Sequence, residues 1–322
     1  MKKEELLSAV METLEKMGME PKAVEVAKLN DEILHGVTVK LKAATKTVDG
    51  TEQTMAPIVY LEQFIDDPLL HMLREEHLPE AAKNIAHQMV SCVANSNSEG
   101  YKGVDLTAQN LQNLPFILAL CDKELNKKFL ADKPYMDVGN GFALFLRIKI
   151  SENRDRFYTV NLTDSRLEML NLTKEEAFEK AFSEAECSDT TLCAMPEVLQ
   201  SIAGEEPTNL LNEIGVGGSP REEEMFLLTD NLYGSAALYR PGLKEKVAEI
   251  LNDDFYVLPS SIHELLIIPA KENHHSEREL GMMVEDVNKH ERARNEVLSY
   301  KVQKFSRRLG KLISCMDMPR FS

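Results

Sequence analysis

Four residues near position 260 bring together the chemical groups of a hydrolytic site: Ser260, Ser261, His263 and Glu264. Hydroxyl, imidazole and carboxylate groups are the types used as nucleophile, base and orienting acid. The spacing does not suit those roles, however. Side chains alternate between the two faces of a strand, so a strand over residues 262–268 would direct His263 away from Glu264. The imidazole could not then be oriented by this carboxylate.

A structural role explains the same residues. Leu258 and Pro259 stand before the serines, where a hydrolase of the G-x-S-x-G type would have its sharp turn. A Pro-Ser-Ser turn whose hydroxyls bond to the backbone, followed by a buried strand with a hydrogen-bonded histidine, is the simpler interpretation. We therefore predict no catalytic residue, and Ser260, Ser261, His263 and Glu264 remain candidates for a hydrolase-like alternative.

Two histidine pairs were considered as metal ligands, and neither predicts a metal site. His71 and His77 flank Glu75 and Glu76, but the spacing is neither H-E-x-x-H nor its inverse. Side chains six positions apart on a helix point in directions about 120° from each other. The pair His274-His275 lies in a polar stretch with Glu272 and Glu277, which is typical of a solvated loop.

Two glycine-containing segments resemble phosphate-binding loops in composition only. Residues 215–219 lack the Lys-Ser/Thr of such a loop and lead into Pro220 and three glutamates, which would repel a phosphate. Residues 234–237 (GSAA) could begin a helix and offer backbone amides to an anion. Close packing of a helix on a sheet accounts for these small residues equally well. We predict no cofactor.

The elements that would position these residues centre on Met225–Lys271. This stretch contains an amphipathic helix pattern over residues 243–251 and apolar runs over residues 255–258 and 265–268, which predict two strands joined at the Pro-Ser-Ser turn. Residues 280–287 mark another helix. The basic segment that follows is expected to continue as a helix to about Gly310.

Similar patterns occur earlier in the chain. Apolar residues on one helical face predict a first helix ending near Gly18, and residues 24–29 and 36–41 alternate as strands do. Residues 141–150 and 157–162 predict a hairpin. Thr173 and Glu176 have the spacing of a capping box, which marks the start of a helix.

These patterns predict a mixed α and β (α+β) fold. We expect short, antiparallel sheets covered by helices in two loosely divided lobes. The N-terminal lobe would comprise residues 1–186, and the C-terminal lobe residues 221–322 with a basic helical end. Residues 187–220, punctuated by glycines and prolines, would form an irregular connection; a further break is expected at residues 95–103.

Charge argues against nucleic acid and membranes as partners. The net charge is −16, although residues 289–311 carry eight basic residues against two glutamates, a net +6 that leaves −22 elsewhere. An acidic chain repels phosphate backbones and anionic lipid surfaces. Nucleic acid could bind only through the basic segment, by way of Lys301, Lys304, Arg307 and Arg308.

Hydropathy and cysteine usage are those of a cytoplasmic protein. No run approaches the length of about 20 apolar residues that a membrane span requires, and the N-terminus has no signal-peptide pattern. The five cysteines are widely spaced and form no C-x-x-C pair. Free, buried thiols in a reducing compartment are therefore expected.

Four segments carry a resemblance to a known family: KLNDEILHGVTV from Lys28, PIVYLEQFID from Pro57, FYVLPSSIHELLIIP from Phe255, and MMVEDVNKHERARNEVLSYKV from Met282. In this order they resemble an uncharacterised bacterial family, a domain of unknown function encountered near mobile elements. The resemblance covers most of the chain and brings no activity, ligand or catalytic residue with it. The leading hypothesis is therefore a non-enzymatic protein that works through protein–protein contact or regulation.

Overall fold

The structure is a computed structural model, and it divides the chain into two compact units. Unit 1 comprises residues 1–28 and 32–113, and unit 2 comprises residues 29–31 and 114–322. The structure describes residues 3–39, 45–46, 52–53, 58–65, 78–98, 111–153, 156–185, 190–201, 204, 206–212, 225–230, 232–271, 273–290 and 294–315.

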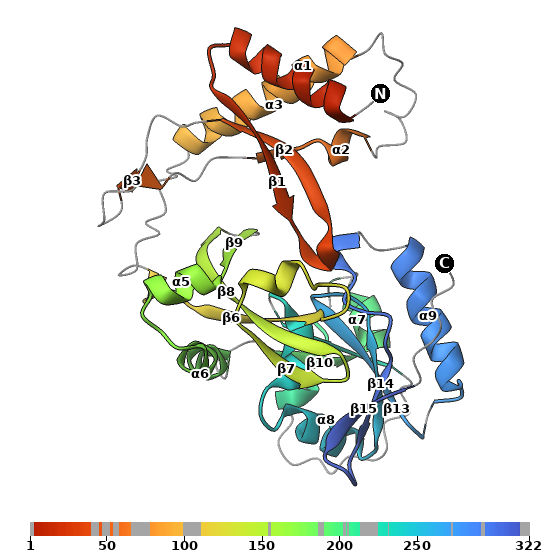
Figure 1. Cartoon of the computed structure of the whole chain (residues 1–322). Helices are drawn as coiled ribbons and strands as arrows, with labels where there is room; N and C mark the ends of the chain where they lie inside the picture. Colours follow the sequence, from red (N-terminus) through yellow and green to blue (C-terminus); the bar gives the residue numbers. More distant parts are fainter. Residues whose placement is uncertain are drawn as a thin grey trace. The chain divides into compact units, whose positions relative to one another are not determined.

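In unit 1, α1 (Lys3–Lys16) and α3 (Leu78–Ser98) pack on a small antiparallel sheet (Figure 1). A shorter helix is α2 (Glu62–Ile65). The sheet has the order β1-β2-β5, formed by β1 (Pro21–Ala27), β2 (Ile33–Val39) and β5 (Ile58–Tyr60), and a separate ribbon pairs β3 (Thr45–Lys46) with β4 (Glu52–Gln53). Leu6, Val10 and Leu14 recur at helical spacing and are fully buried, so the apolar stripe of α1 forms part of the core.

Unit 2 contains a four-stranded antiparallel sheet in which β8 is the longest strand. The strands are β6 (Phe116–Asp122), β7 (Tyr135–Gly139), β8 (Phe142–Asn153) and β9 (Arg156–Asn161). β8 pairs with each of the other three, and its hairpin with β9 confirms the strand pair predicted from residues 141–162. The helices that follow are α5 (Asp164–Met169) and α6 (Lys174–Ala185).

The start of α6 is the capping box that the sequence predicts. The Thr173 hydroxyl accepts a hydrogen bond from the Glu176 amide at 3.2 Å, and the Glu176 carboxylate accepts one from the Thr173 amide at 2.8 Å. A second box of the same kind, Ser276 with Glu279, starts α9 (Glu277–His290). Each box supplies partners for amides that the first turn of a helix leaves unpaired.

Unit 2 also contains a six-stranded antiparallel sheet, in the order β10-β11-β13-β12-β14-β15. Its strands are β10 (Thr191–Ala194), β11 (Phe226–Thr229), β12 (Phe255–Pro259), β13 (Glu264–Pro269), β14 (Gln303–Ser306) and β15 (Lys311–Ser314). The central hairpin β12–β13 confirms the two strands predicted on either side of the Pro-Ser-Ser turn. Beside the strands lie α7 (Met195–Ser201), α8 (Leu243–Leu251) and α9.

Short 3₁₀ helices complete unit 2, and one of them contacts both sheets. They are η1 (Leu29–Asp31), η3 (Phe129–Asp132), η4 (Leu210–Asn212), η5 (Gly234–Tyr239) and η6 (Arg294–Glu296). All six residues of η5 are buried, and η5 packs against β6 of one sheet and against β11 and β13 of the other. The small residues of η5 therefore serve close packing, the second of the two roles considered for residues 234–237.

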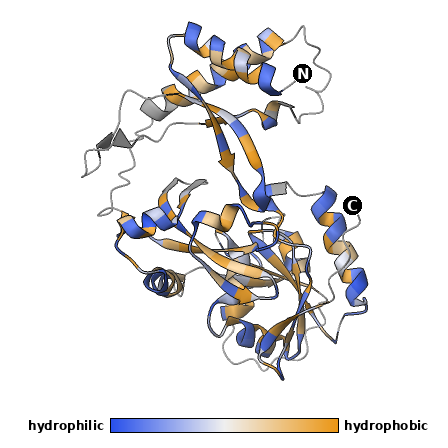
Figure 2. Ribbon diagram, in the orientation of Figure 1, coloured by the Kyte–Doolittle hydropathy of each residue, from blue (hydrophilic) through white to orange (hydrophobic). Residues whose placement is uncertain are grey.

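The apolar residues of unit 2 follow this layering. Apolar colour concentrates along the strands in Figure 2, while α9 carries both polar and apolar residues. Leu280 and Val284 of α9 pack on Tyr256, Leu258 and Ile268 of the sheet. The arrangement of antiparallel sheets with separate helices is the α+β class that the sequence predicts.

Two sequence-based expectations about secondary structure are wrong. The basic segment does not continue as a helix to Gly310: residues 303–306 form β14 and residues 311–314 form β15. Pairing of β14 with β12 buries Phe305 against Phe255, with ring centroids 5.1 Å apart, and this tertiary contact overrides local preference. The break expected from residue 95 also begins too early, because α3 continues to Ser98.

The connection predicted at residues 187–220 stays a prediction for the part outside the described residues. The described part forms β10, α7 and η4, and β10 pairs with β11.

The cysteines in the described residues are free thiols. Cys121, Cys193 and Cys315 are buried, whereas Cys92 is partly exposed; Cys187 lies outside the description. Burial raises the pKa of Cys121, Cys193 and Cys315. Within the described ranges no helix has the length and hydropathy to cross a membrane.

Candidate functional site

The turn between β12 and β13 holds the residues that the sequence marks as candidates. The Ser260 hydroxyl donates a hydrogen bond to Glu264 Oε1 at 3.1 Å. The Ser261 amide donates to the Glu264 carbonyl at 3.1 Å, and the Ser261 hydroxyl accepts from the His263 amide at 3.1 Å. The Ser261 hydroxyl thus bonds to the backbone in the way predicted for a Pro-Ser-Ser turn, whereas the Ser260 hydroxyl bonds to a side-chain carboxylate.

The imidazole of His263 lies on the surface, and His263 stands just before the strand. β13 begins at Glu264, which leaves His263 in the turn, where its side chain is exposed. Its ring stacks on Tyr233, with the centroids 5.5 Å apart and the planes at 29°. The Arg147 guanidinium lies 4.9 Å from the Tyr233 centroid. The structure brings Ser260 and Glu264 together, and it places the His263 ring on Tyr233.

An apolar pocket of about 150 Å³ lies between α9 and the β12–β13 hairpin. Ser260 and Asn288 are its polar lining residues. The other lining residues are apolar: Met225, Leu258, Pro259, Leu266, Met283, Val284 and Val287. The sheet supplies one wall through Leu258 and Pro259 of β12 and Leu266 of β13, and α9 supplies the other through residues one turn apart. Pockets of this kind, apolar with a few polar groups, are the usual form of a binding site.

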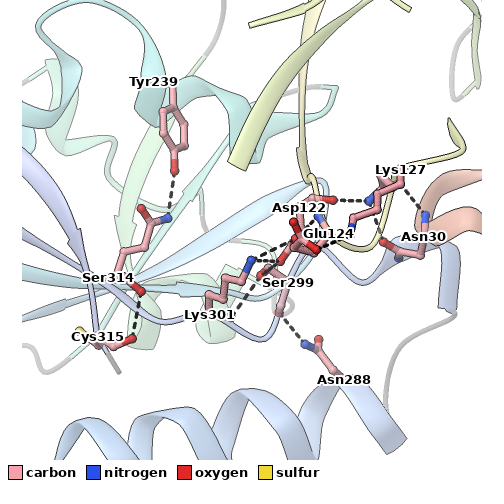
Figure 3. A network of polar contacts seen from close by, with 12 residues as sticks. Asn30, Asp122, Glu124, Lys127, Tyr239, Asn288, Ser299, Lys301, Ser314 and Cys315 are labelled. Atoms are coloured by element: carbon pink, nitrogen blue, oxygen red, sulfur yellow. Dashed lines mark hydrogen bonds and ion pairs between the residues drawn. The ribbon is translucent and has the colours of Figure 1, made fainter. Parts of the chain in front are cut away.

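Asn288 carries an acceptor without a partner at this pocket. Its side chain is 4% exposed, and its Nδ2 donates to the Ser299 carbonyl at 2.9 Å, which fixes the orientation of the amide. Figure 3 shows this amide extending from α9 toward the segment of Ser299. Among the described residues, Asn288 Oδ1 has no hydrogen-bond partner. A buried acceptor left in this state costs about 1–3 kcal/mol, so its retention calls for an explanation.

The apolar surface continues outward from the pocket along α9. Met282, Met283 and Val287 are 53%, 40% and 39% exposed. Met283 and Val287 also line the pocket, so the exposed and recessed apolar surfaces are continuous. We call Met283, Val287 and the pocket together the α9 surface.

A buried ion pair lies on the side of Ser299 that faces away from α9 (Figure 3). The Asp122 carboxylate, at the end of β6, is 1% exposed and lies 3.1 Å from the Lys301 ammonium. It also accepts hydrogen bonds from the Ser299 hydroxyl at 2.7 Å and from the Glu124 amide at 2.8 Å. Because the carboxylate is so well paired, the network positions the 299–301 segment rather than offering a reactive group.

The basic residues considered for nucleic acid are distributed over separate internal contacts. Lys301 pairs with Asp122, Lys304 lies over the Tyr256 ring at 5.1 Å, and Arg307 Nη1 donates to Asn252 at 3.2 Å. Arg308 is exposed in the turn between β14 and β15. A strand, a turn and a strand replace the single basic helix, so these side chains do not form one stripe.

The remaining candidates yield no site in the described residues. No group of three or more His, Cys, Asp or Glu able to hold a metal ion occurs there, and His274 and His275 are exposed in the loop before α9. The segment 66–77, with His71, Glu75, Glu76 and His77, lies outside the described residues, as does 213–224 with its glycines.

Sequence reasoning missed the α9 surface, although one signal was present. Leu280, Val284 and Asn288 recur at intervals of four and so share one face of a helix. An asparagine on an otherwise apolar stripe indicates a buried polar group in need of a partner. Only the pairing of α9 with β12–β13 shows that this stripe borders a pocket.

Together the fold and the site define an α+β protein with an apolar pocket at the end of a helix–sheet layer. Comparison with known families matches residues 3–307 to a family described as "Family of unknown function (DUF5688)". The chain belongs to this family, which is the kind of family that its sequence resembles. Searches of curated proteins and of solved structures find no match.

Proposed function

We propose that the chain is a non-enzymatic cytoplasmic protein that acts by binding another protein through the α9 surface. The observation that carries the proposal is that Met283 and Val287 are exposed and also line the apolar pocket. Unpaired apolar surface next to a recess is the usual mark of a protein-binding site. Methionine suits such a surface because its unbranched, polarizable side chain adapts to different partners.

The geometry of the turn supports binding over hydrolysis. A hydrolase would use Ser260 as nucleophile with His263 as base. The Ser260 hydroxyl instead donates to Glu264, and the His263 ring stacks on Tyr233. Activation of Ser260 by His263 would therefore require the turn to be rebuilt.

Charge supports a basic partner. The exposed residues of α9 have a small excess of acid, with Glu277, Glu279 and Asp286 against Arg278 and Lys289, and the net charge of the chain is −16. A complementary partner would present apolar side chains flanked by lysine or arginine, which increases the association rate and adds selectivity. An amphipathic helix with one apolar face and basic flanks fits this description.

Binding of a model peptide tests the proposal. The probe is a fluorescein-labelled amphipathic helix of about 16 residues with leucine on one face and lysine on the other. We expect saturable binding by fluorescence anisotropy, weakened about tenfold or more by Val287→Asp or Met283→Asp. Leu309→Asp is the matched control, because Leu309 is also exposed, at 49%, and lies outside the α9 surface.

Thermal melting of each variant shows whether the fold is retained. Equal binding by Val287→Asp and Leu309→Asp would contradict the proposal. So would the absence of peptide binding combined with an esterase activity that Ser260→Ala abolishes, which would favour the hydrolase instead.

A further inference from the structure

The unpaired acceptor at the pocket limits what can bind there. Asn288 Oδ1 is a hydrogen-bond acceptor, so only a donor can satisfy it. The bond from Nδ2 to the Ser299 carbonyl prevents the amide from rotating to present its N–H groups instead. In the described residues no donor meets this atom. A bound group that brings an N–H would remove the cost of leaving the acceptor unpaired.

The other residues that line the pocket favour an apolar occupant. Seven of the nine lining residues are apolar, and the volume is about 150 Å³. An apolar cavity of that size in another protein accepts a benzene ring, so an aromatic ring is the appropriate scale for the occupant. The occupant thus combines an aromatic ring with a hydrogen-bond donor.

We propose that the pocket takes the indole ring of a tryptophan from the partner, with the indole N–H donating to Asn288 Oδ1. This inference rests on the proposed function. The indole nitrogen is a donor only, so a single acceptor satisfies it, whereas a tyrosine hydroxyl would bring an acceptor of its own into an apolar pocket. Tryptophan is also the side chain most enriched among anchors that dominate binding energy.

The occupant comes from a different protein. This chain contains no tryptophan, so a second copy of it cannot supply the indole. The net charge of −16 favours basic residues next to the tryptophan in the partner.

Access to the acceptor requires one side chain to move. Asn288 Oδ1 is screened from solvent, so a ring reaches it only when a lining residue shifts. Met283 is suited to this movement because it is 40% exposed and unbranched. Opening the pocket in this way costs a change of the Met283 rotamer and leaves the strands of the sheet in place.

Tryptophan fluorescence gives a direct test, since the protein contributes no tryptophan signal. Three peptides share the basic amphipathic sequence and differ at one central position, which carries tryptophan, 3-benzothienylalanine or leucine. Benzothienylalanine has the size and shape of tryptophan with sulfur in place of the N–H. We expect a blue shift of the tryptophan emission on binding, and about tenfold tighter binding of the tryptophan peptide than of its sulfur analogue.

Two variants check the location. Val287→Phe narrows the pocket at its α9 wall, and Asn288→Leu removes the acceptor. We expect Val287→Phe to abolish the blue shift and Asn288→Leu to abolish the preference for tryptophan over benzothienylalanine. The comparison of peptides on the unaltered protein requires no mutation, so it stands even if Asn288→Leu fails to fold.

The outcomes separate this inference from the proposed function. Equal affinities for the tryptophan and benzothienylalanine peptides would overturn the role of Asn288. Equal affinities for all three peptides would overturn the aromatic anchor while leaving protein binding intact. No binding of any peptide would overturn the proposed function and this inference together.

Discussion

At the scale of single residues, the hydrogen-bond partners of Glu62 in unit 1 determine the direction of its pKa shift. Its carboxylate accepts hydrogen bonds from the Lys3 ammonium at 2.8 Å and from the His35 amide at 3.0 Å. It lies 3.0 Å from His35 Nδ1 as well. Burial raises the pKa of Glu62, but the hydrogen bonds to Lys3 and His35 outweigh it, so the net pKa is below the usual range.

The lowered pKa predicts a pH dependence of the stability of unit 1. A carboxyl whose folded pKa is below its unfolded value stabilises the fold above the unfolded pKa, and this contribution is lost as the pH falls through the folded pKa. We expect Glu62→Gln to reduce the free energy of unfolding by about 2 kcal/mol at neutral pH and by much less in acid. Urea unfolding followed by circular dichroism at both pH values measures this difference.

Glu4→Gln, at an exposed position of α1, is the control and should have little effect at either pH. A loss for Glu62→Gln that is the same at neutral and acidic pH would show that the charge of Glu62 is not the cause.

At the scale of elements, η5 shows why small residues are placed at a crowded position. It packs against β6, β11 and β13, and every one of its residues is buried. A Cβ on Gly234 would clash with the His263 carbonyl oxygen and would lie 2.9 Å from the backbone of Thr229. The backbone atoms in these contacts cannot move away as a flexible side chain would.

Gly234→Ala is therefore expected to lower the free energy of unfolding of unit 2 by about 3 kcal/mol. Gly310→Ala is the matched control: Gly310 has a φ of +62° and open space around it, so only the backbone conformation opposes alanine, at a cost of about 1 kcal/mol. Chemical denaturation measures both. The packing explanation fails if the two variants lose the same stability.

At the scale of the whole molecule, the charge distribution bears on nucleic-acid binding. The basic residues 289–311 look like one patch in the sequence, but the structure spreads them over α9, β14, a turn and β15. Lys301 is paired with Asp122, and Lys289 is paired with Glu285 on α9. The net charge of −16 on the chain as a whole repels a phosphate backbone.

We therefore expect no measurable binding of labelled duplex DNA or single-stranded RNA in anisotropy titrations at low salt. Low salt favours electrostatic binding, so the test is stringent. Binding that weakens steeply with added salt, and that is lost in the double variant Arg308→Glu/Lys311→Glu, would contradict this expectation. It would support nucleic acid as a partner.

Local patterns predicted much of the fold. The apolar stripe of α1, the hairpins β8–β9 and β12–β13 and the capping box at Thr173 follow from periodicity and from the chemistry of a few neighbouring residues. The basic end was wrongly predicted as a helix, because strands there depend on pairing with β12, which is distant in sequence. The pocket also depends on contacts between residues distant in sequence. The sequence therefore predicted only the part of the candidate site that lies in the turn between β12 and β13.

The sequence by itself determined the α+β class, the acidic charge and the family resemblance. Only the tertiary structure decided that His263 stacks on Tyr233, that the basic residues are dispersed, and that Met283 and Asn288 of α9 border a pocket with Ser260. The division has a physical cause. Periodicity and capping depend on residues a few positions apart, whereas a pocket depends on which faces of separate elements are packed together.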